Sequence, residues 1–113
     1  MNRTIKTFAL AALLAAFTAG VQASAMPKGN AAKGKEASAA CAACHGEDGN
    51  SKSGEFPKLA GQHADYLYNS LVQYKSKQRK NAIMGGFAAT LSRQQMADLA
   101  AFYASQKGLD HKY

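Results

Sequence analysis

Two cysteines and a histidine lie within five residues, in Cys41-Ala42-Ala43-Cys44-His45, and this cysteine stretch constrains the chain more than any other feature. The chain has no further cysteine. Two thiols three positions apart can form a redox-active dithiol, half of a zinc site, a small structural disulfide, or the attachment point of a covalent cofactor. Each alternative makes a different demand on the remainder of the chain.

Three segments have the apolar periodicity of helices, and no segment alternates as a strand does. They are 31–40, which leads into the cysteine stretch, 63–77 and 93–106. Asn30 is a candidate N-cap for the first helix. Ser92 with Gln95 forms a capping box for the third. The connections 46–61 and 81–91 are rich in turn-forming residues and are predicted to be loops. The sequence therefore predicts an all-α fold.

Residues 1–25 have the pattern of a signal peptide that is removed from the mature protein. Arg3 and Lys6 are followed by an apolar run, and Ala23-Ser24-Ala25 supplies the small residues of a cleavage site. An uncleaved anchor is the alternative, but the run of roughly 15 apolar residues is shorter than the roughly 20 that a spanning helix needs. We therefore expect a mature domain over 26–113 in an oxidising compartment, the bacterial periplasm.

The expected mature domain has few side chains with which to build a core. Leu, Ile, Val and Phe together supply 11 of its 88 residues. A share below roughly 20% with appreciable net charge is typical of disordered chains, yet this sequence is clearly periodic. A small domain that is short of core needs another source of stability. With two cysteines only, a large apolar cofactor would make up the deficit.

Covalent haem meets the demands of the cysteine stretch best. A thioredoxin-like dithiol accompanies strands, which the periodicity does not predict. Zinc needs four ligands, and the remaining His63 and His111 are not spaced as a pair. A disulfide across so short a loop stabilises little. On one helical turn, Cys41 and Cys44 face the same side, so each can form a thioether with one haem edge. His45 then points toward the iron.

Haem iron has a second axial position, and its occupant decides the chemistry. The candidates are Met26, Met84, Met96, His63 and His111. Met96 falls on the apolar stripe of the third predicted helix, where methionine usually fills space. Met84 lies in the predicted loop 81–91 beside Gly85-Gly86, which let a backbone pass close to a bulky group. Met84 is therefore the predicted ligand.

The order of several longer segments carries a resemblance. They are CAACHGEDGNS, FPKLAGQ, YLYNSLVQYKSKQR, MGGFAATLS and MADLAAFYASQ, and together they cover essentially the whole expected mature chain. The chain resembles the small single-haem bacterial class I c-type cytochromes, and one half of the di-haem periplasmic cytochromes c. The resemblance implies an all-α fold in which three main helices and loops surround one covalently bound haem.

The resemblance also implies roles for individual residues. Cys41 and Cys44 carry the haem c through thioethers, and His45 and Met84 are the axial ligands of its iron. The backbone carbonyl of Pro57 accepts a hydrogen bond from the ligand histidine. In addition, Leu59 and Leu91 are expected to pack on the haem, and Gly34 is expected to let the first and last helices cross closely.

These roles imply a periplasmic one-electron carrier of the respiratory chain and not an enzyme, because His/Met ligation leaves iron no open position. Without residues 1–25, 12 basic residues face seven acidic ones, for a formal charge of +5. Four cations lie close together, at Lys75, Lys77, Arg79 and Lys80. We expect a monomer that docks on acidic patches of redox partners, with at most peripheral contact to anionic membranes and no nucleic-acid binding.

Two other function classes stay open at this stage. One is a cytochrome subunit held in a larger oxidoreductase complex. The other is a haem-based sensor or enzyme, which requires a labile sixth ligand in place of a firmly bound Met84.

Overall fold

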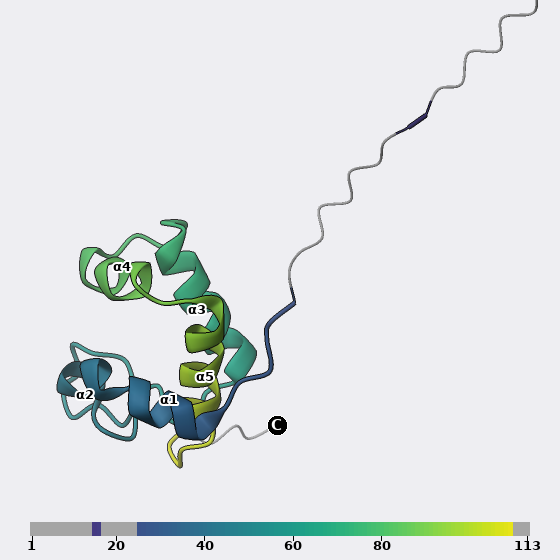
Figure 1. Ribbon diagram of the computed structural model, residues 1–113. Helices are drawn as coiled ribbons and strands as arrows, with labels where there is room; N and C mark the ends of the chain where they lie inside the picture. The colour runs from purple at the N-terminus through teal and green to yellow at the C-terminus, as the bar shows by residue number, and fades with distance from the viewer. Residues whose placement is uncertain (1–14, 17–24, 110–113) are drawn as a thin grey trace, which may run out of the picture.

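The computed structural model describes residues 15–16 and 25–109, and the regular structure within them is entirely helical (Figure 1). The helices are α1 (Ala31–Ala37), α2 (Ala39–His45), α3 (Ala64–Lys75), α4 (Ala82–Ala89) and α5 (Arg93–Ala104). The prediction of an all-α fold is confirmed for this part of the chain. Most of the predicted signal peptide and His111 lie outside the described residues. No helix within the described ranges is both long and apolar enough to cross a membrane.

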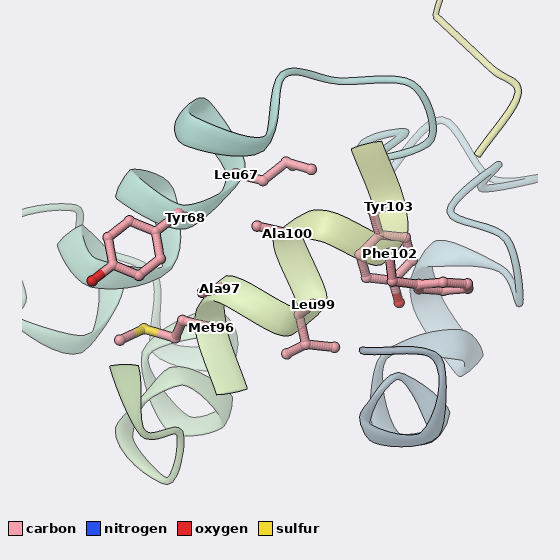
Figure 2. Close-up of a cluster of buried hydrophobic side chains, with 8 residues drawn as sticks. All are labelled: Leu67, Tyr68, Met96, Ala97, Leu99, Ala100, Phe102 and Tyr103. Atoms are coloured by element: carbon pink, nitrogen blue, oxygen red, sulfur yellow. The ribbon is translucent and has the colours of Figure 1, made fainter. Parts of the chain in front are cut away.

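Helix α5 forms the centre of the core. Seven of its 12 residues are buried, and both α1 and α3 pack against it. The core cluster joins α5 to Leu67 and Tyr68 of α3 (Figure 2). Met96 belongs to this cluster, as its place on the apolar stripe predicts. The predicted capping box is present, because Ser92 Oγ accepts from the backbone of Gln95 at 3.1 Å and the Gln95 side chain accepts from the backbone of Ser92 at 2.8 Å.

Helices α1 and α5 cross at Gly34, as predicted. A Cβ at this position would lie 2.0 Å from the carbonyl oxygen of Asp98, so no residue with a side chain fits without movement. The segment before α1 is tied to α5 as well. The backbone N–H of Asn30 donates to Asp98 Oδ1 at 2.8 Å, and the side chain of Gln94 donates to the carbonyl of Lys28 at 2.9 Å. Asn30 also caps α1, as expected.

The first predicted helix is divided in two. Helix α1 ends at Ala37, and α2 begins at Ala39 and includes the whole cysteine stretch. Ser38 lies between them, buried, and its hydroxyl donates to the carbonyl of Lys35 at 2.7 Å. Such a bond from a serine side chain to the preceding turn competes with the helical pattern, which accounts for the break.

The prediction of a loop over 81–91 is wrong, because residues 82–89 form α4. Asn81 caps this helix, and its side chain accepts from the backbone N–H of Met84 at 3.0 Å. The glycine pair suggested a loop, yet each glycine costs a helix only about 1 kcal/mol relative to alanine, so the pair costs about 2 kcal/mol. The cap and the complete burial of Ala88 offset that cost. Met84 is therefore a helical residue, and the fold has more helices than the three predicted.

Candidate functional site

A cavity of about 250 Å³ is lined by residues of α2, α3, α4 and α5. Cys41 and His45 reach it from α2, and Met84 reaches it from α4. These two helices lie apart on the left of Figure 1, with α3 and α5 to their right. The structure thus brings four of the predicted site residues, these three and Pro57, to one cavity although α2 and α4 are distant in the sequence.

The wall of the cavity is mainly apolar. Its aliphatic members are Leu59, Leu67, Leu71, Leu99 and Ala100. Leu67 and Leu71 form the apolar stripe of α3, so this stripe serves the cavity as well as the core. Leu59 and Leu91 both pack against the core cluster, and of the two Leu59 lines the cavity. An apolar wall with a few polar groups is typical of a cofactor site.

His45 is the last residue of α2 and is buried, with 6% of its surface exposed. Its Nδ1 lies 2.9 Å from the carbonyl oxygen of Pro57, so the hydrogen bond predicted between these two residues is present. A carbonyl can only accept, so Nδ1 must carry the proton. In a neutral imidazole the other nitrogen, Nε2, then has its lone pair available for a metal.

Both cysteines are free thiols and half-buried, so they do not form the structural disulfide weighed above. They lie one turn apart on α2. Cys41 lines the cavity, and burial raises the pKa of its thiol. Cys44 lines a separate surface depression, together with residues that include Gly46 and Phe56. One thiol therefore faces the cavity while the other lies outside its wall.

Within the described residues, the other candidates for an axial ligand do not reach the cavity. Met96 is buried in the core cluster, Met26 packs against that cluster, and the exposed His63 precedes α3 as its N-cap. A zinc site is not indicated either, because the described residues contain no group of three His, Cys, Asp or Glu side chains that could hold a metal. Among the described candidates, Met84 alone lines the cavity.

Arg79 also lines the cavity, which the sequence did not predict. Its guanidinium carbon lies 6.0 Å from the ring centre of Tyr66 and 5.4 Å from that of Tyr74, within reach of cation–π attraction. It also donates to Ser70 Oγ at 3.1 Å. Hydrogen bonding to Arg79, followed by its charge, lowers the pKa of Tyr66. The spacing of Tyr66, Ser70 and Tyr74 along one face of α3 is the signal that could have found this cluster.

The family model for cytochrome c matches residues 31–107 of this chain. The chain belongs to the cytochrome c family. The matched range begins with α1 and ends beyond α5, so it includes every helix described above. Family membership makes haem c, with its iron, the cofactor of this cytochrome.

Individual relatives agree with the family assignment. Over 90 residues the chain is 46% identical to cytochrome c4 of Pseudomonas aeruginosa, a match that covers 80% of this chain and 45% of that protein. It is 43% identical to cytochrome c-554(548) of Halomonas halodenitrificans, covering 70% of this chain and 99% of the relative. The chain thus spans about half the length of the cytochromes c4 that it matches.

Solved structures of related proteins have the same fold as this chain. The crystal structure of reduced recombinant cytochrome c4 from Pseudomonas stutzeri superimposes with a TM-score of 0.68 at 42% identity, covering 72% of this chain and 47% of that one. The fold is therefore the class I cytochrome c fold. The residues around the cavity fit the cofactor that this fold carries, because they combine an apolar wall, the oriented imidazole of His45, the thioether of Met84 and the free thiol of Cys41.

Proposed function

We propose that this cytochrome is a one-electron carrier whose covalently bound haem c has His45 and Met84 as its axial iron ligands. The observation that carries the proposal is the meeting of Cys41, His45 and Met84 at one apolar cavity. Haem c bound there supplies the one-electron change between ferric and ferrous iron. Ligation on both faces leaves no position for a substrate, which favours a carrier over an enzyme.

The protein residues have separate tasks in this proposal. Cys41 and Cys44 tether the cofactor through thioethers from successive turns of α2. His45 Nδ1 donates to the Pro57 carbonyl oxygen, 2.9 Å away, which orients the imidazole and makes Nε2 a stronger ligand. The leucines of the wall limit the access of water to the cofactor, and a drier surrounding changes the reduction potential.

We further infer that the mature protein is a periplasmic monomer, cleaved after Ala25. The signal-peptide pattern of residues 1–25 supports the location.

A groove near the cavity supports electrostatic docking of acidic redox partners. Four cations line this basic groove, together with small residues of α4; the cations are Lys75, Lys77, Arg79 and Lys80. The groove contains no acidic residue among those described. Charge complementarity of this kind speeds the encounter of transient redox partners.

Exchange of one methionine at a time tests the ligand assignment. Met84→Leu removes the sulfur from the cavity, whereas Met96→Leu makes the same chemical change in the core cluster. We expect the visible absorption spectrum of the purified holoprotein to change in Met84→Leu only. An unchanged spectrum in Met84→Leu would show that this sulfur does not bind the iron. A pyridine haemochrome assay that finds no covalent haem in the wild-type protein would remove the basis of the whole proposal.

A further inference from the structure

The hydroxyl of Tyr103 is a buried polar atom without a hydrogen-bond partner among the described residues. Only 4% of the Tyr103 surface is exposed. Figure 2 shows Tyr103 beside Phe102 at the end of the core cluster, and their ring centres are 5.0 Å apart. Buried polar groups are rarely left unpaired in native proteins, so this hydroxyl calls for an explanation.

Two side chains on the neighbouring helices lie within electrostatic reach of this hydroxyl. Burial raises the pKa of Tyr103, and contact with the Cys41 thiol raises it further, while Ser38 lowers it. The proton of the Ser38 hydroxyl is already donated to the carbonyl of Lys35. Gly49 packs directly against the ring and limits its movement on that side, since a Cβ on Gly49 would lie 2.7 Å from Cδ1 of Tyr103. The hydroxyl is therefore held near Cys41.

The chemistry of Cys41 changes when a thioether forms. A free thiol is a weak donor as well as a weak acceptor, whereas a thioether sulfur has no proton and can only accept. Tyr103 and Cys41 line the same cavity, and Cys41 packs against the core cluster to which Tyr103 belongs. The buried phenolic donor then faces a sulfur that can only accept.

We propose that Tyr103 is a positioning residue for the cofactor: its hydroxyl donates a hydrogen bond to the Cys41 thioether sulfur and holds that attachment in place. The inference rests on the proposed attachment of haem at Cys41. The bond gives a partner to the buried hydroxyl and holds the sulfur in one orientation. Because a donated hydrogen bond draws electron density away from the haem edge, it favours the ferrous state and raises the reduction potential.

Tyr103→Phe removes the hydroxyl and keeps the ring. We expect a lower reduction potential by spectroelectrochemical titration and a lower midpoint of chemical denaturation. Tyr68→Phe is the matched control, since Tyr68 is equally buried in the core cluster but its hydroxyl accepts from Arg93 Nε at 3.1 Å and does not line the cavity. This control should lower the denaturation midpoint and leave the potential unchanged. A Tyr103→Phe potential equal to that of wild type overturns the proposal.

The sulfur itself is tested by repeating the exchange in a Cys41→Ala background, in which haem stays attached through Cys44. There, Tyr103→Phe should no longer shift the potential. An equal shift in both backgrounds overturns the proposal, because the hydroxyl would then act through Ser38 or a water molecule.

Resonance Raman spectra of wild type and Tyr103→Phe in H2O and D2O give an independent answer, even if the Cys41→Ala protein does not accumulate. Deuteration should shift the thioether C–S band in wild type only. A wild-type band at the same position in H2O and D2O overturns the proposal. Intact-mass spectra of the same samples report covalent haem. If haem is attached but Tyr103→Phe leaves the potential and the band unchanged, the Tyr103 proposal is wrong and the proposed carrier function is unaffected. If the wild-type protein contains no covalent haem, both proposals are wrong.

Discussion

Replacing Gly34 by alanine tests how closely α1 and α5 cross. The added Cβ would lie 2.0 Å from the carbonyl oxygen of Asp98 and 2.6 Å from its carbonyl carbon. Ordinary van der Waals contact begins at 3.4 Å, so the helices have to separate by the difference, 1.4 Å, along this direction. Both contacts are backbone atoms, and no side-chain rotation can relieve them.

The cost follows from three contributions. Overpacking of a close contact costs about 1–3 kcal/mol. Separation of the helices also weakens the bond from Asn30 to the Asp98 carboxylate, and a hydrogen bond to a charged group contributes about 1.5–3 kcal/mol. In the opposite direction, alanine stabilises a helix by about 1 kcal/mol relative to glycine. We therefore expect Gly34→Ala to lower the free energy of unfolding by about 3 kcal/mol, a drop in Tm of about 12–24 °C for a domain of this size.

Thermal unfolding of the holoprotein, followed by far-ultraviolet circular dichroism, measures this loss. Gly86→Ala in α4 is the matched control, because a Cβ there meets nothing within 4 Å. At Gly86 the substitution by alanine should raise the free energy of unfolding by up to about 1 kcal/mol. The reasoning is refuted if Gly34→Ala is as stable as wild type, or if the two variants shift Tm in the same direction.

Three further predictions concern α5 and the basic groove. Hydrogen bonds in the folded state lower the pKa of Asp98, so its carboxylate stabilises the fold above pH of about 4, and this contribution is lost as pH falls through the folded-state pKa. Asp98→Asn should lower the unfolding free energy at pH 7 by about 1–3 kcal/mol and flatten its acid dependence in urea titrations; an unchanged acid limb contradicts this. Ser92→Ala should cost about 1 kcal/mol by the same urea titration, and a cost near zero would mean that the capping box contributes nothing. Lys80→Glu should slow oxidation by ferricyanide more than Lys35→Glu on α1 does, since Lys80 lines the groove; equal rates in stopped-flow contradict it.

The parts of the fold that the sequence predicted well are those set by local signals. The capping box at Ser92 defines the start of α5, and the stripe through Leu67 and Leu71 defines α3. Gly34 was found through the resemblance, because its role depends on two helices at opposite ends of the chain. The break at Ser38 was missed because a single serine bonded to the preceding turn leaves no trace in the apolar periodicity.

The loop predicted around Met84 shows the opposite error, in which a local signal was overruled. Gly85-Gly86 is typical of loops, but the cap at Asn81 and the burial of Ala88 outweigh it. The meeting of Cys41 and His45 at one cavity was predictable because the cysteine stretch is contiguous. Arg79 and the hydroxyl of Tyr103 were not, since their roles depend on which groups the folded helices place beside them.

The central position of α5 determines the order in which the domain can assemble. Most of the core cluster lies on this helix, and Asn30 bonds to Asp98 across 68 positions of sequence. Closing so long a loop lowers the entropy of the chain, and this loss is offset only once the α1–α5 contact has formed. Contacts of this kind slow folding. The cysteine stretch of a newly made chain therefore lies on an open polypeptide until α5 docks. Thioether formation can act on that open chain, and the docking of α5 then closes the wall behind the cofactor.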